Sequence, residues 1–195
     1  PWYIGDTIPV GIGQSYWTTT PVQLNTSVNT LINAGERYIP QIIRGYMNTD
    51  SSVDLIPLKS LRPIEIKNRN NLDVVLNAMR DVVSGEEGGA RHAFADTPYD
   101  SAGKTGTAQL FTVGQNEKYD ATKIDERLRD NAMYVGFAPF NDPEISVTVV
   151  LENVGGGSKN AAPVARQIMD FYFRDRVFET AEADSANTDN ELGTN

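Results

Sequence analysis

The sequence has no cysteine and a single histidine, His92, among its 195 residues. The lack of cysteine excludes disulfide bonds and thiolate metal sites, but it leaves the cellular compartment open. A zinc site would have to be built mainly from carboxylates, and a histidine-based catalytic triad would depend on His92 alone, within a glycine-rich segment. We therefore expect no metal, no cofactor and a surface or loop-packing role for His92.

Long apolar runs and clusters of positive charge are missing as well. No run approaches the roughly 20 apolar residues of a membrane-spanning helix, and no signal peptide is visible. The sequence starts at Pro1 rather than at methionine, so we expect a processed product or a piece of a longer chain. The net charge of −9 makes nucleic acid a poor partner, because phosphate binding needs clustered lysine and arginine.

What is present suits one domain followed by a tail. Hydrophobic residues make up 39% of the sequence, which is enough for a core in a chain of this length. Residues 179–195 carry five acidic residues and no lysine or arginine. This composition predicts a domain over residues 1–178 and an acidic disordered tail over residues 179–195.

The first helix is predicted from its caps. Residues 1–19 are rich in glycine and threonine and are expected to form a loop. Thr20 can cap the helix that follows, Pro21 suits the first helical position, and Gln23 completes a capping box. The helix should run to about residue 33, because Gly35 then supplies a left-handed stop.

Two more helices are predicted from apolar periodicity. Apolar residues three and four positions apart predict a helix over residues 72–83, and Gly85 ends it. A last helix is predicted over residues 161–174, after a flexible link formed by glycines 155–157. The apolar stripes are expected to face the core rather than a ligand.

Three strands are predicted between these last two helices. One contains Lys104, and the other two cover residues 133–138 and 145–151. A tight connection at residues 141–144 predicts an antiparallel hairpin, while residues 38–43 suggest a short extended piece near the start of a mixed segment. The order of elements predicts an α+β fold in which helices pack on an antiparallel sheet.

The first of these strands carries the residues best suited to chemistry. They form the run Lys104, Thr105, Gly106, Thr107, Ala108 and Gln109. On an edge strand the lysine offers a cation, the threonines offer hydroxyls, and the glycine lets a ligand approach the backbone. The Thr107 amide can donate to a developing oxyanion, and the strand edge can pair with an extended peptide. These are the needs of an enzyme that binds a peptide with a free carboxylate and attacks its carbonyl.

The run has two other interpretations. A chance match on a surface strand would need no function. Gly103, Lys104 and Thr105 also match the end of a nucleotide-binding loop, but that motif needs a glycine where Pro98 stands and a helix afterwards.

Nearby serines do not supply a nucleophile. Ser101 precedes Lys104 by three residues, but a Ser-x-x-Lys nucleophile needs both side chains on one face of a helix, whereas a strand turns them to opposite faces. Ser27 and Asn29 match Ser-x-Asn but lie inside the predicted first helix. The charged run at residues 126–130 is expected to be a solvated loop.

At this point the sequence resembles the class B penicillin-binding proteins, in particular their elongation-type members, over residues 1 to about 175. The strand run is the third signature of that family, after a Ser-x-x-Lys and a Ser-x-Asn. Further matching segments are residues 1–3, 5–9, 11–14, 16–17, 19–24, 33–35, 126–130 and 137–139.

The resemblance implies a peptidoglycan D,D-transpeptidase that cross-links stem peptides ending in D-Ala-D-Ala through an acyl-serine intermediate and that binds β-lactams. It implies an inner-membrane protein facing the periplasm, with a glycosyltransferase of the elongation complex as partner. Lys104 and Thr107 would act in catalysis, and Thr105, Gly106, Thr107 and Gln109 would bind the substrate.

The first two signatures have no convincing counterpart here, so the nucleophile should precede Pro1. The resemblance then implies that this chain is the C-terminal part of the transpeptidase domain, that the missing N-terminal part is its partner, and that the chain alone is inert. Two alternatives remain open: a non-catalytic module that binds peptides along the Lys104 strand, and a β-lactam hydrolase or sensor.

Overall fold

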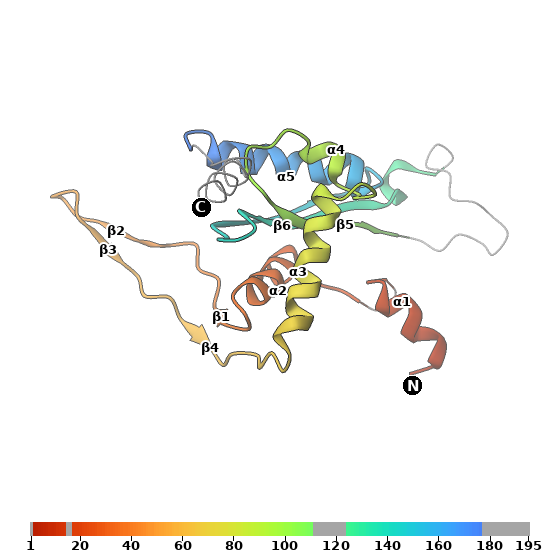
Figure 1. Cartoon of the computed structure of the whole chain (residues 1–195), viewed down its shortest axis with the longest axis horizontal. Coiled ribbons are helices and arrows are strands. Elements are labelled where there is room, and N and C mark those ends of the chain that lie inside the picture. The colour runs from red at the N-terminus through yellow and green to blue at the C-terminus, as the bar shows by residue number, and fades with distance from the viewer. Residues whose placement is uncertain (1, 15–16, 111–123, 177–195) are drawn as a thin grey trace, which may run out of the picture.

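The computed structural model describes residues 2–14, 17–110 and 124–176 (Figure 1). The predicted tail over residues 179–195 lies outside the described residues. Among the helices that are described, none combines the length and the apolar character that crossing a membrane requires.

A three-stranded antiparallel sheet forms the centre of the described fold. Its strands are β5 (Ala102–Ala108), β6 (Asn131–Ala138) and β7 (Ile145–Leu151), in the order β5-β6-β7. Lys104 pairs with Val135 across the first ladder. The predicted hairpin and the antiparallel sheet are both confirmed, and β5 and β7 are the edge strands of this sheet within the described residues.

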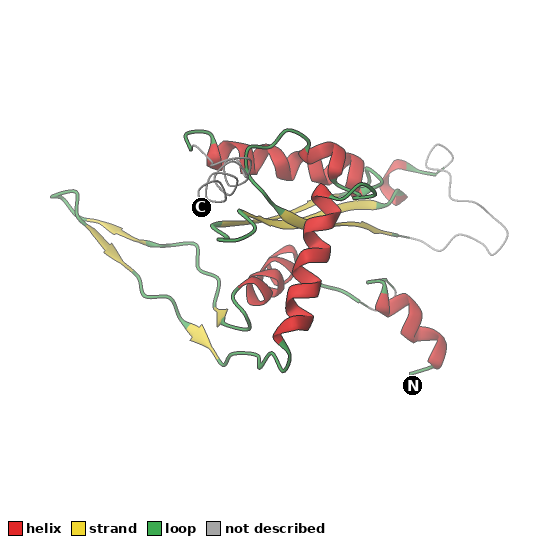
Figure 2. Cartoon of the chain, in the orientation of Figure 1, coloured by secondary structure: helices red, strands yellow, loops and turns green. Residues whose placement is uncertain are grey.

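Helices cover both faces of the sheet (Figure 2). On one face lie α5 (Gly157–Phe173) and the short α4 (Arg91–Phe94), and on the other lie α2 (Pro21–Ile32) and α3 (Arg69–Ser84). Strand alternation divides the core accordingly. Tyr134 points toward α4 and α5, whereas Val135 points toward α2 and α3. The predicted α+β fold of helices on an antiparallel sheet is confirmed.

The caps predicted for the first helix are present in α2. The Thr20 hydroxyl accepts from the Gln23 amide at 3.2 Å, and the Thr20 amide donates to the Gln23 side chain at 2.9 Å. Gly35 has a φ of +98°, as a left-handed stop requires. The second predicted helix is α3, which ends just before Gly85 and buries Leu72.

Two expectations about loops are wrong. Residues 1–19 include a 3₁₀ turn, η1 (Ile4–Asp6), and a short helix, α1 (Thr7–Gly11), because the Asp6 carboxylate accepts from the Tyr3 amide at 3.0 Å and starts the first turn. The glycine run before the last helix is not simply a link, since Gly157 is already the first residue of α5 and is buried.

The segment between α2 and α3 forms two small pairs of antiparallel strands, and it projects away from the central sheet and its helices (Figure 1). Strand β1 (Arg37–Tyr38) pairs with β4 (Ser60–Leu61), and β2 (Gly45–Met47) pairs with β3 (Val53–Leu55). The extended piece predicted over residues 38–43 is therefore strand only at Tyr38. The charged run starts with a second 3₁₀ turn, η2 (Glu126–Leu128), and its last residue, Asp130, is buried rather than solvated.

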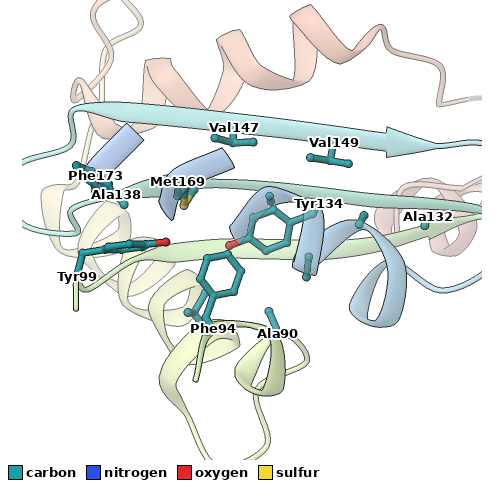
Figure 3. Packing of buried hydrophobic residues seen from close by; sticks show 14 residues of the cluster. Ala90, Phe94, Tyr99, Ala132, Tyr134, Ala138, Val147, Val149, Met169 and Phe173 are labelled. Carbon is teal, nitrogen blue, oxygen red and sulfur yellow. The ribbon is translucent and has the colours of Figure 1, made fainter. Parts of the chain in front are cut away.

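Tyr134 fills the core beneath the β5 strand (Figure 3). Its ring stacks on Phe94 with centroids 5.4 Å apart, and its hydroxyl fits between Gly103 and Gly136, where a Cβ on either glycine would overlap it. Burial raises the pKa of the Tyr134 phenol. The hydroxyl has no hydrogen-bond partner among the described residues.

Replacing Tyr134 by phenylalanine should stabilise the protein. A buried hydroxyl without a partner costs about 1–3 kcal/mol, so we expect Tyr134→Phe to gain about 1 kcal/mol and to raise the melting midpoint by about 2–4 °C. The unfolded phenol ionises near pH 10 but the folded one does not, so stability falls as pH rises above that value, and the variant lessens this loss.

Calorimetry at pH 7 and at alkaline pH measures both effects. Tyr99→Phe is the matched control, because the Tyr99 hydroxyl donates to the Asp170 carboxylate at 2.7 Å and its removal should lower the midpoint. A Tyr134→Phe variant that melts at a lower temperature than the parent protein would refute the assignment of an unpaired hydroxyl.

Candidate active site

The outer edge of β5 carries the predicted site residues. Side-chain donors reach two of its carbonyls from outside the sheet: Lys104 Nζ donates to the Thr105 carbonyl and Gln14 Nε2 to the Thr107 carbonyl, both at 2.7 Å. The N–H and C=O of one residue in an antiparallel strand point to the same edge. The amides of Thr105 and Thr107 therefore also point away from β6, where an oxyanion or a peptide can reach them.

The side chains divide between the two faces of the sheet. Thr105 pairs with Tyr134 and Thr107 with Ala132, so both threonines lie on the α5 face. Lys104 pairs with Val135, lies on the face of α2 and α3, and is exposed. The ammonium group bends back to the strand edge, because it donates to the Thr105 carbonyl. The edge thus combines a cation, outward amides and two hydroxyl side chains.

Gly106 and Gln109 occupy different positions from the other site residues. The backbone of Gly106 is covered on the α5 face by Gly157, so a ligand cannot approach it from that side. Gln109 follows the end of β5 and is exposed. The structure therefore brings Lys104, Thr105 and Thr107 together along one edge and leaves Gln109 just beyond it.

Ser101 is not placed to be a nucleophile. Only 1% of its surface is exposed, whereas Lys104 is exposed on the strand. Ser101 and Lys104 therefore do not form a nucleophile pair, as expected, although Ser101 lies just before β5 rather than within it. Ser27 lies inside α2, where its hydroxyl donates to the Leu24 carbonyl at 2.7 Å. His92 is exposed on α4, and the described residues contain no cluster of three or more potential metal ligands.

Sequence reasoning missed two residues that touch the site. Gln14 lies 93 positions before Thr107 yet bonds its carbonyl, and Gly157 contacts the Gly106 backbone. Both belong to glycine-rich segments that were expected to form loops. Glycine-rich segments show little apolar periodicity, and these two contacts form only when the chain has folded, so the sequence does not indicate them.

An exposed Lys-Thr-Gly-Thr edge on an antiparallel sheet, with helices on both faces, defines the class of penicillin-recognising serine acyl-transferases. The comparisons with known proteins identify the family within that class. Residues 1–170 match the family described as "Penicillin binding protein transpeptidase domain". The chain therefore belongs to the penicillin-binding protein transpeptidase family.

Individual relatives point to the elongation-type members. The chain is 42% identical over 178 residues to peptidoglycan D,D-transpeptidase MrdA of Haemophilus influenzae, covering 91% of this chain and 27% of the relative. It is 40% identical over 172 residues to MrdA of Escherichia coli K12, covering 87% of this chain and 26% of that protein. The chain thus spans about a quarter of the length of these curated relatives.

Solved structures agree on the fold. Pseudomonas aeruginosa PBP2 in complex with WCK 5153 is 36% identical with a TM-score of 0.71, covering 93% of this chain and 37% of that chain. Penicillin-binding protein 2B of Streptococcus pneumoniae R6, at 22% identity, superimposes with a TM-score of 0.69 over 92% of this chain and 28% of that chain. The predicted resemblance to elongation-type class B proteins is confirmed, and the chain corresponds to a portion of the transpeptidase domain.

Proposed function

We propose that this chain is the C-terminal part of a peptidoglycan D,D-transpeptidase of the PBP2 type and supplies one wall of its active site. The longer protein would be anchored in the inner membrane and face the periplasm. The observation that carries the proposal is the outer edge of β5, where the Thr107 amide and the Lys104 ammonium group are both accessible.

The reaction needs a serine from the N-terminal part of the protein. Its hydroxyl oxygen attacks the carbonyl of the penultimate D-alanine, the peptide C–N bond breaks, and the terminal D-alanine leaves with the proton. An amine of a second stem peptide then attacks the acyl-serine ester, forms the cross-link and releases the serine. A β-lactam acylates the same serine by opening of its ring.

Each residue of the β5 edge has a proposed role in this reaction. The Thr107 amide stabilises the oxyanion of the tetrahedral intermediate. Lys104 supplies positive charge for the terminal carboxylate of the substrate, and the hydroxyls of Thr105 and Thr107 donate to it. Gly106 keeps the strand free of a side chain between the two threonines, and Gln109 extends the binding edge.

Gln14 occupies one of the backbone groups that a peptide bound along this edge would use. Strand addition requires the outward amides and carbonyls of β5 to pair with the ligand backbone. The Thr107 carbonyl already accepts from Gln14 Nε2. We infer that the substrate binds the Thr107 amide while Gln14 stays bonded to the Thr107 carbonyl.

A fluorescent penicillin tests the proposal directly. The longer protein should be labelled covalently, and prior heat denaturation should abolish labelling. The 195-residue chain alone should remain unlabelled, because it lacks the nucleophile motif.

Two outcomes count against parts of this proposal. Covalent labelling of the isolated chain would show that it carries its own nucleophile. Reversible binding of D-Ala-D-Ala peptides by the longer protein, lost in Lys104→Ala and without any penicillin labelling, would favour the non-catalytic peptide-binding module.

A further inference from the structure

We propose that Gly157 is a positioning residue that sets the orientation of the Thr107 amide. It lies outside the strand that carries the site, at the first position of α5. The inference rests on the proposed function, because it concerns the oxyanion donor of that reaction.

The contact between Gly157 and the sheet leaves no room for a side chain. Gly157 is buried, and a Cβ built on it would overlap the carbonyl oxygens of Gly106 and Met133 and lie 3.0 Å from the Gly106 nitrogen. All three atoms belong to the backbone of the β5–β6 ladder. A backbone cannot rotate out of the way as a flexible side chain does, so any larger residue at this position must move the strand or the helix.

A movement of the Gly106 carbonyl also changes the orientation of the Thr107 amide. The Gly106 carbonyl and the Thr107 N–H belong to one planar peptide unit, so they tilt together. Since the Thr107 carbonyl points to the outer edge, its own amide does so as well. The Gly106 carbonyl lies at the other end of this unit and faces β6, where Gly157 covers it. Gly157 therefore acts on the donor from behind the strand, without touching the substrate.

The N-terminal end of α5 is held firmly, which makes the strand the part that must yield. The Ser158 hydroxyl donates to the Gly89 carbonyl. Asn160 Nδ2 donates to the carbonyls of Val154 and Gly156 at 2.9 and 3.2 Å. Further along the helix, side chains of Ala161, Ala162, Ala165 and Met169 are fully buried against the sheet.

The neighbouring glycine provides a matched control. A Cβ on Gly156 would meet only the Thr107 hydroxyl oxygen, at 4.0 Å, which is ordinary contact. Gly156 has a φ of −68°, a conformation that alanine adopts without strain. Gly156→Ala and Gly157→Ala thus add the same methyl group one residue apart, and only the second strikes the backbone of β5.

The experiment measures acylation of the longer protein by a penicillin in stopped flow. It separates K, the dissociation constant of the non-covalent complex, from k2, the first-order rate constant of acylation. We expect Gly157→Ala to lower k2 by about tenfold or more, because a displacement of about 1 Å in a catalytic group can cost about 100-fold. We expect K to change much less than k2, because Lys104 and Thr105, which also bind the penicillin carboxylate, lie outside the peptide unit that moves. Both constants should be unchanged in Gly156→Ala.

A second variant decides the matter if Gly157→Ala does not fold. Ser158→Ala removes the hydrogen bond to Gly89 that holds the start of α5, and Ser158 is exposed, so the fold should survive. We expect k2 to fall a few-fold with K unchanged.

An unchanged k2 in a folded Gly157→Ala protein would overturn the inference. If Gly157→Ala does not fold, an unchanged k2 in Ser158→Ala would overturn the inference as well. A loss of active protein with normal k2 in the remainder would show a purely structural role and would also overturn it. If the parent protein itself is never acylated, the proposed function fails instead, so the two failures are distinguishable.

Discussion

Replacing Thr107 by proline should slow acylation by a penicillin about 100- to 1000-fold relative to Thr107→Val, because proline removes the N–H that stabilises the oxyanion. The ladder with β6 should survive this change. The Thr107 amide points to the outer edge of β5, so no hydrogen bond between the strands is lost. Proline is tolerated at such edge positions, and Gly106 before it is already extended, as proline requires.

The comparison with valine isolates the amide from the hydroxyl. Both variants lose the threonine hydroxyl, but only proline loses the N–H. We expect Thr107→Val to lower k2/K by about 10- to 100-fold, since a hydrogen bond to a charged carboxylate contributes about 1.5–3 kcal/mol. Stopped-flow acylation of the longer protein measures both values, and a melting scan checks the fold. Equal rates for folded proline and valine variants would remove the Thr107 amide from the mechanism.

The sequence correctly predicted the helices and strands that are stabilised by residues close to one another in the chain. The capping box of Thr20 and Gln23 depends on residues three positions apart, and it is present as expected. The hairpin of β6 and β7 follows from two apolar runs and a short polar connection. In these cases the energy that selects the structure comes from neighbours in the sequence, so the sequence displays it.

The parts that sequence reasoning missed depend on distant contacts. Glycines 155–157 have low intrinsic helix propensity, which suggested a link. Gly157 is nevertheless the first residue of α5, and its close contact with the Gly106 and Met133 carbonyls leaves room only for a glycine there. Gln14 is similar: nothing in its own segment indicates a hydrogen bond to a strand 93 residues later.

In the candidate site, too, some features follow from the local sequence and others depend on distant contacts. Ser101 and Lys104 were correctly kept apart, since the first is buried and the second exposed, and β5, which carries Lys104, Thr105 and Thr107, is an edge strand among the described residues. The direction of the free edge, however, depends on which neighbour β5 pairs with. Only the register with β6 shows that the amides of Thr105 and Thr107 point outward.

Replacing Lys104 by alanine should lower k2/K for a penicillin by up to about 100-fold, because the carboxylate of the ligand loses a charge-assisted partner. Lys104 is exposed at the outer edge of β5, with its ammonium group bonded to the Thr105 carbonyl. Removing the side chain therefore deletes positive charge from the site without opening a cavity in the core. Since Lys104 acts through its charge, the effect should shrink as salt concentration rises.

Two further variants show whether charge at this position is the cause. Lys104→Arg keeps the cation and should retain more activity than the alanine variant, although its planar group cannot reproduce the same contacts. Lys59→Ala removes an exposed lysine beside β4, away from β5, and should acylate at the parent rate. If Lys104→Ala is acylated within twofold of the parent protein at low salt, the carboxylate is recognised elsewhere, and the threonine hydroxyls of the same edge become the groups to test.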